Sequence, residues 1–342
     1  MASPDPMFRQ LLIQRRRQLL IQSKGKSVPY PKVPAPRYPV LLERKYAAWI
    51  MRLLQPLATI SNAWARDEYP GILEAYRRDS NDLHQDADSF ALTLRLGESL
   101  SNAQTEMDLE PNGTAAARIM STAEAVNLHI AKRYSMERRI ALGSVYEISE
   151  PWVQGALTEW TETNRRLIKS LAIEAQTRME AMVLEAVQTG ERPESLVSRI
   201  YNLNRSTGIA RAKLIAADQV GKLTGFLSEQ RSLAIGMDTY TWQTAMDERV
   251  RGNPGGLYPT ARPSHWGAQG KVGIFGKGDV WLVDGKQVPR GSNDPIGAPG
   301  FPIRCRCVAS SRWEDVLKPI DEELLLDPYV LAEMGKGPWP GS

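Results

Sequence analysis

The sequence predicts an α+β protein in which a long, mostly helical N-terminal and central region precedes a small β-rich module. Apolar residues recur at three- and four-residue spacing through much of residues 41–236, which is typical of amphipathic helices. From Met237 the pattern changes, because "DTYTWQTAMD" alternates and is rich in threonine and aromatic residues, as strands are. "VWLVDGKQVP" places Asp284-Gly285 between two apolar runs, which is a strong hairpin signal. Helices first and strands afterwards favour segregated α and β parts.

Residues 1–40 are predicted to form a basic arm and a proline-rich linker. Eight Lys or Arg residues and no Asp or Glu occur between Met7 and Leu42. Five prolines between Pro29 and Pro39 favour a stiff extended spacer, because each proline fixes φ and lacks an N–H. An arm on a spacer could reach a partner, or the N-terminus could be disordered. The net charge of +4 does not by itself indicate nucleic acid, so the distribution of charge matters more.

Residues 41–150 are predicted to form a helical domain, and residues 151–236 to form long helices. The second block has the stronger apolar face. Gly190 is expected to end one helix and Pro193 to begin the next, since glycine suits the position after a helix and proline its first turn. The helix that follows is expected to end at Gly236.

Residues 237–312 are predicted to form the β-rich module, and residues 313–342 a tail. The stretch "DEELLLDPYVLAEM" is acidic and amphipathic, so it could dock in a partner's groove or fold on its own module. No apolar run approaches the roughly 18–20 residues that span a membrane. Three arginines interrupt "LLIQRRRQLLIQ", which excludes a signal-peptide core there. We expect a soluble, intracellular chain with no membrane contact and with reduced cysteines.

Both cysteines of the chain lie in "FPIRCRCVAS", at Cys305 and Cys307. In a strand, residues two apart point to the same side, so both thiols could face one point, with His265 or Asp247 completing a site. Zinc takes thiolate and imidazole ligands in a tetrahedral arrangement, whereas a disulfide between residues i and i+2 is geometrically poor. Three interpretations stay open: a structural zinc site, a metal-free cluster that holds loops together, and a catalytic cysteine with His265 as its base.

Other short motifs point to no further chemistry. "QVGKLTG" contains Gly-Lys, but Ala216 stands where a phosphate-binding loop has its first glycine. The sequence has no HExxH, CxxC, EF-hand or GxSxG pattern. His84 and His129 lie in helical stretches and are expected to be structural or solvated. Arg304 and Arg306 are expected to face away from the thiols, towards solvent, acidic residues or phosphate.

Four segments occur in a characteristic order: "RAKLIAADQVGKL", "GMDTYTWQTAMDERVR", "PSHWGAQGKV" and "APGFPIRCRCVAS". This ordered set resembles the phage Mu F-like head morphogenesis family, the minor head proteins of tailed bacteriophages, over about residues 150–310. Two insertions depart from the family pattern: "GNPGGLYPTARP" precedes the histidine, and a hairpin segment follows the Gly-Lys-Val. The first 150 residues match no motif. The resemblance carries the family pattern onto Asp218, Gln219, Trp242, Asp247, Arg249, Arg251, His265, Gly270, Cys305 and Cys307.

The resemblance implies a virion component, not an enzyme, located in the capsid interior near the portal vertex after assembly in the host cytoplasm. It implies the portal protein, major capsid or scaffold proteins and packaged double-stranded DNA as partners. The basic arm would contact DNA without reading sequence, because lysine and arginine neutralise phosphates. The alternative is a zinc-dependent hydrolase or effector module that uses His265, Cys305 and Cys307. The candidate DNA contacts of the arm are Arg9, Arg15, Arg16, Arg17, Lys24 and Lys26.

Overall fold

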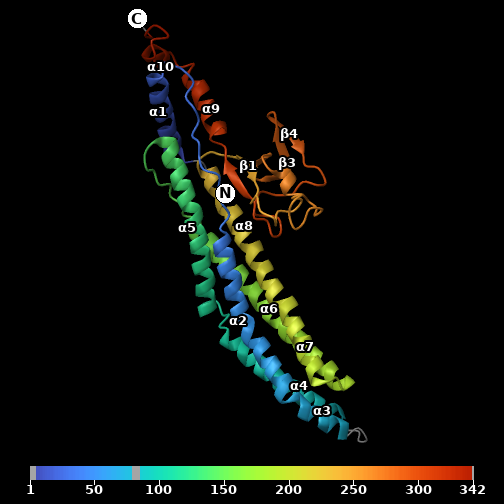
Figure 1. Ribbon diagram of the computed structural model, residues 1–342. Helices are drawn as coiled ribbons and strands as arrows, with labels where there is room; N and C mark the ends of the chain where they lie inside the picture. Colours follow the sequence, from blue (N-terminus) through green and yellow to red (C-terminus); the bar gives the residue numbers. More distant parts are fainter. Residues whose placement is uncertain (1–4, 79–84, 341–342) are drawn as a thin grey trace. The chain divides into compact units, whose positions relative to one another are not determined.

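A computed structural model describes residues 5–78 and 85–340 of the 342-residue chain (Figure 1). The chain forms two compact units. Unit 1 comprises the chain up to Pro39, Ala125–Gln154 and the chain from Val220 onward, and unit 2 comprises Val40–Glu124 and Gly155–Gln219. Each unit therefore combines segments that are apart in sequence, whereas the sequence analysis divided the chain into consecutive segments.

The predicted α+β class is confirmed, because the described elements are helices as far as Ala234 and the strands come after them. The third and fourth helices are Tyr69–Arg78 (α3) and Gln85–Glu106 (α4), and the described residues end in two short helices, Trp313–Leu324 (α9) and Pro328–Glu333 (α10). The remaining helices are α1 (Pro6–Gln22), α2 (Val40–Asp67), α5 (Thr114–Leu142), α6 (Val153–Thr189), α7 (Pro193–Leu203), a π-helical turn η1 (Asn204–Ile209) and α8 (Ala210–Ala234).

Unit 2 is a helical bundle whose core was predicted from helical periodicity. Helix α2 packs against α3, α4 and α7. The hydroxyl of the buried Tyr46 donates a hydrogen bond to Asn164 Oδ1 at 2.9 Å, which satisfies both polar groups inside the core. Ile168 and Met179 of the predicted α6 face are buried, and each such side chain contributes about 1.5–3 kcal/mol by leaving water.

The predicted boundary between α6 and α7 is confirmed. Gly190 follows α6 with φ of 63°, a left-handed conformation that glycine adopts without a steric cost. Pro193 begins α7, where its missing N–H costs no hydrogen bond. Tyr69 stabilises this junction, because its hydroxyl lies 2.8 Å from the carbonyl oxygens of both Ala186 and Glu191.

Unit 1 contains a five-stranded antiparallel sheet with the strand order β4-β3-β2-β1-β5. The predicted hairpin is confirmed, and its two turn residues, Asp284 and Gly285, both have positive φ, as a type I′ turn requires. The sheet has Tyr240 directly opposite Gly273. A Cβ at Gly273 would lie 2.4 Å from the tyrosine ring, so only glycine fits there. The strands are β1 (Thr239–Gln243), β2 (Val272–Ile274), β3 (Lys277–Val283), β4 (Lys286–Pro289) and β5 (Val308–Ser311).

The N-terminal helix is part of the folded unit 1, which corrects the prediction of an arm on a spacer. Helix α1 packs against α9 and α10 from the other end of the chain (Figure 1). Its buried residues Phe8, Leu12, Arg16 and Leu20 recur every four positions, so they form one stripe along the helix. Phe8 lies against Trp313 of α9, with ring centroids 6.4 Å apart.

The acidic tail folds on its own module, which is one of the two alternatives that the sequence left open. Helix α9 buries Trp313, Leu317, Ile320 and Leu324. Asp327 caps α10 by accepting hydrogen bonds from the first backbone N–H groups of that helix. Across residues 5–78 and 85–340, no helix has the length and the apolar character to cross a membrane.

Candidate metal centre

Trp242, His265, Cys305 and Cys307 come together in the core of the β-rich module. The two thiols and the imidazole offer ligand atoms that all lie within 4.8 Å of one another. Cys307 Sγ lies 3.5 Å from His265 Nδ1. The three residues are 1–3% exposed and both cysteines are free thiols. This group could hold a metal ion.

The strand predicted across the two cysteines is wrong. Both cysteines precede β5, in a segment where the Cys305 N–H donates to the carbonyl of Pro302 at 2.9 Å. Arg304 has φ of 57°, so the backbone turns immediately before Cys305. The thiols still face one point, although neither cysteine lies in a strand.

Two glycines on α8 allow the segment that carries the cysteines, residues 299–307, to pack directly against the helix backbone; we call it the cysteine segment. A Cβ at Gly221 would lie 2.6 Å from the carbonyl oxygen of Cys305 and 3.3 Å from that of Gly300. A Cβ at Gly225, one helical turn later, would lie 2.6 Å from the carbonyl oxygen of Pro299. The segment therefore rests directly on the helix backbone. "QVGKLTG", which does not form a phosphate loop, supplies this contact surface.

The electrostatics of the two thiols differ. Burial alone would raise the pKa of Cys305, but hydrogen bonds from Cys307 and His265 outweigh it and hold the pKa well below its usual value. The N–H of Gly300 also reaches Cys305 Sγ, at 3.4 Å. Burial and the neighbouring Cys305 raise the pKa of Cys307 well above its usual value. Cys305 is therefore the more acidic of the two thiols.

The donor set fits a soft divalent metal such as zinc. Tetrahedral zinc with Zn–S bonds of about 2.3 Å places its ligand atoms about 3.8 Å apart, close to the spacing found here. Backbone N–H groups of Gly300 and Ala245 approach the sulfur atoms of Cys305 and Cys307, as the outer partners of thiolate ligands do. His265 Nε2 is buried and has no hydrogen-bond partner among the described residues. Within the described part of the chain, the group has three protein ligands and no fourth.

An aromatic and cationic cluster supports the centre from the side of the sheet. The Trp242 ring meets His265 edge-on, with centroids 5.8 Å apart, and it meets Trp281 in the same way at 5.9 Å. The Arg290 guanidinium lies 3.8 Å from the centroid of Trp281 and donates to the Tyr240 hydroxyl at 3.0 Å. Sequence analysis missed Arg290, since its partners come from strands and turns that no local pattern connects to it.

Asp247 does not complete the metal group. Its carboxylate instead accepts a hydrogen bond from the backbone N–H of Arg249 at 3.0 Å, and its carbonyl accepts one from the Asn253 side chain. Arg251 links the loop to the cysteine segment, because its guanidinium donates to the carbonyl of Ile303 at 2.9 Å. Of the two alternatives for completing the group of thiols, the structure therefore has His265 and not Asp247, while Arg251 contacts the segment that carries the cysteines.

Three other residues of the family pattern, Asp218, Gln219 and Gly270, lie outside the metal group. Asp218 and Gln219 lie on α8 within unit 2, where the Trp160 indole donates to the carbonyl of Gln219 at 3.0 Å. Gly270 has φ of 78° and donates its N–H to the carbonyl of Trp242 at 2.9 Å. Glycine suits that turn because it adopts positive φ freely.

The cations predicted to bind DNA are largely engaged within unit 1. Arg16 is 2% exposed and forms an ion pair with Asp321, so the prediction that it contacts DNA is wrong. Arg17 forms an ion pair with Glu333 at 2.8 Å, and Arg9 forms an exposed one with Glu323 at 3.6 Å. The Arg15 guanidinium lies against Gly143, the residue after α5. Lys24 and Lys26 are exposed.

Among the described residues, the other histidine, His129, takes no part in the centre. His129 is exposed, and its Nε2 atom lies 3.0 Å from the carbonyl oxygen of Arg37, which fits the predicted structural or solvated role. His84 lies outside the described residues.

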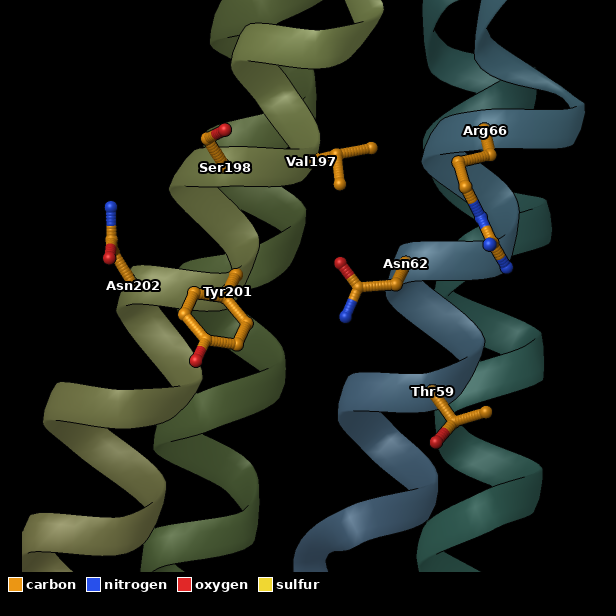
Figure 2. A pocket seen from close by; sticks show the side chains of 7 residues that line it. All are labelled: Thr59, Asn62, Arg66, Val197, Ser198, Tyr201 and Asn202. Carbon is orange, nitrogen blue, oxygen red and sulfur yellow. The ribbon is translucent and has the colours of Figure 1, made fainter.

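Unit 2 has a polar pocket of about 620 Å³ between α2 and α7, which the sequence did not indicate (Figure 2). Asn62 and Val197 point into the space between the two helices (Figure 2). The lining residues carry no thiol, imidazole or carboxylate, so the pocket offers neither a metal site nor an acid–base pair. Its lining consists of Thr59, Asn62, Arg66, Val197, Ser198, Tyr201 and Asn202.

Comparison with known proteins finds one informative similarity. An uncharacterized protein of Haemophilus influenzae is 32% identical to this chain over 108 residues. The match covers 32% of this chain and 24% of that protein, so the chain spans about a quarter of the relative's length. No family model matches the chain, and no solved structure matches it.

Proposed function

We propose that the chain is a minor head protein of the phage Mu F-like type, which acts in head morphogenesis at the portal and in the capsid interior. One observation carries the proposal: motif residues that are far apart in sequence converge on one buried centre. Trp242, His265, Cys305 and Cys307 meet there, and Arg251 contacts the cysteine segment. The residues of a family motif are expected to meet at one site when the motif marks a structural module. Their convergence here supports the resemblance.

Within this proposal, the centre holds a structural zinc ion. His265 comes from the loop after β1 and the two thiols from the segment before β5, so a metal ion would fasten two irregular segments to each other. Such segments contain little regular hydrogen bonding, and metal binding energy contributes directly to their folding. Zinc would also remove the difference in pKa between Cys305 and Cys307, because it binds both cysteines as thiolates.

Burial supports a structural and not a catalytic role for the proposed metal. A catalytic zinc keeps one position open for water or substrate. Three protein ligands would leave such a position here, which is the feature that favours the hydrolase or effector alternative. However, each ligand residue is at most 3% exposed, so a substrate cannot reach the ion in this conformation. The proposal therefore assigns the zinc a structural role.

Copurification with the portal protein of the phage that encodes the chain tests the assembly role. The two proteins are expected to elute together from a sizing column after coexpression, with the chain in a fixed ratio to the portal ring. A portal ring that elutes without the chain, at concentrations up to tens of micromolar, would contradict the role at the portal.

Elemental analysis of the purified chain tests the metal. We expect one zinc ion per chain, lost in Cys305→Ser and in His265→Ala but kept in the matched control His129→Ala. Loss of zinc should also lower the thermal stability of the β-rich module, because a structural metal contributes folding energy. Wild-type protein with no metal, or a zinc-free form with unchanged stability, would contradict the structural site.

A further inference from the structure

Four arginines lie on the two segments that the metal centre joins. Arg249, Arg251 and Arg262 belong to the loop after β1, and Arg304 belongs to the cysteine segment. We call these four residues the arginine surface. Its two parts are in contact, since the Arg251 guanidinium donates to the carbonyl of Ile303, the neighbour of Arg304, at 2.9 Å.

The loop after β1 folds back on itself, which brings its arginines together. The Trp266 N–H donates to the carbonyl of Arg251 at 3.0 Å. Gly252 lies against Ser264, two residues from Arg262, so closely that a Cβ at Gly252 would lie 2.7 Å from the serine Cβ. The loop ends at His265, whose ring faces the thiols, so the position of the arginines depends on the same contacts as the centre.

The arginine surface is not neutralised by the chain itself. Arg249, Arg262 and Arg304 are exposed, and among the described residues none of the three has a carboxylate partner. Asp247 turns its carboxylate to a backbone N–H of the loop. The cations of α1 differ in this respect, because three of them are in ion pairs with α9 and α10. Four arginines against Asp247 and the exposed Glu248 of the same loop leave the surface with a net positive charge.

We propose that the arginine surface binds the phosphate groups of double-stranded DNA. The inference rests on the proposed function, and it moves the DNA contact from α1 to the β-rich module. Guanidinium groups suit phosphate because each presents a planar fork of N–H donors and stays charged at any physiological pH. Phosphate contacts carry no sequence information, so the proposed binding does not depend on the base sequence.

Fluorescence anisotropy with a labelled duplex of about 30 base pairs measures the interaction. The wild-type chain is titrated against two unrelated sequences over a series of salt concentrations. In Arg249→Gln/Arg304→Gln we expect about tenfold weaker binding to both sequences and a slope of log affinity against log salt that is smaller by about 2, because two phosphate contacts are lost.

The matched control changes the same charge elsewhere in unit 1. Lys132→Gln/Arg139→Gln removes two exposed cations from α5 and is expected to bind within about twofold of the wild type. Equal weakening in the two double variants would overturn the arginine surface while leaving DNA contact in place. That result would assign the affinity to net charge.

A wild-type chain that binds neither duplex with a salt-dependent affinity would overturn both the arginine surface and the DNA contact expected from the sequence. The occupant would then be an acidic protein surface, for which the exposed Tyr258 and Ile303 beside the arginines are suited. Copurification with the portal protein tests the assembly role independently of this outcome.

Discussion

The substitution Gly221→Ala tests how the cysteine segment is positioned. The new methyl group would lie 2.6 Å from the carbonyl oxygen of Cys305, whereas ordinary contact begins at 3.4 Å. The segment must therefore move by about 0.8 Å, because a backbone oxygen cannot rotate away as a side chain can. Cys305 supplies one of the three candidate ligands, so this movement acts directly on the metal centre.

Two opposing contributions set the size of the effect. Alanine in a helix interior is favoured over glycine by about 1 kcal/mol. Overpacking against a backbone segment costs about 1–3 kcal/mol, which exceeds that gain. The difference is about 0–2 kcal/mol, so we expect a net destabilisation of about 1 kcal/mol and a melting temperature about 3 °C lower for a unit of roughly 190 residues. Metal affinity should fall by roughly tenfold, as it does when groups that position ligands are disturbed.

Gly155→Ala is the matched control, since Gly155 is also helical and a Cβ there would meet no atom within 4 Å. It should stabilise its helix by about 0.5–1 kcal/mol. Thermal unfolding and titration with Co²⁺, followed through the thiolate-to-metal absorption band, measure both quantities. A Gly221→Ala variant as stable as Gly155→Ala and with wild-type Co²⁺ affinity would refute the close packing of the cysteine segment against α8.

Two further predictions concern the packing of unit 1. Arg16→Gln, which breaks a buried ion pair with α9, should lower stability by about 3 kcal/mol, whereas Arg9→Gln on the same helix should cost less than about 0.5 kcal/mol because its ion pair is exposed. Equal thermal shifts would contradict the buried position of α1. Burial raises the pKa of Asp315, but hydrogen bonds from Arg312 and Thr239 outweigh it and hold the pKa below the usual 3.8. The stability that Asp315 contributes is therefore present above about pH 4 and lost as pH falls through its folded-state pKa, so the difference in melting temperature from Asp315→Asn should shrink there.

Local patterns predicted the parts of the fold that depend on neighbouring residues. The hairpin at Asp284-Gly285 follows from two positions that need positive φ. The junction at Gly190 and Pro193 follows from the backbone preferences of those residues. β1 followed from alternation alone. In each case the deciding physical constraint acts within a few residues, so a single sequence is enough to identify it.

Features that depend on contacts between distant segments were not predicted, although the sequence carries an indication of two of them: the burial of Arg16 and the irregular backbone before the cysteines. The four-residue spacing of Phe8, Leu12, Arg16 and Leu20 places an arginine within an apolar stripe, which indicates a buried partner for its charge. Pro302 just before the cysteines argues against a strand there, because proline lacks the N–H that a sheet uses. Which carboxylate pairs with Arg16 depends on tertiary packing, and local patterns do not encode it.

The proposed function implies that a phage or prophage encodes this chain, and its most direct test is the protein content of the purified particles. Quantitative mass spectrometry of DNase-treated particles should find the chain in a small and constant number of copies relative to the portal protein. Electron microscopy of particles that carry a tagged chain should place the tag inside the head at the portal vertex. Infectious, DNA-filled particles that lack the chain would contradict its assignment as a minor head protein.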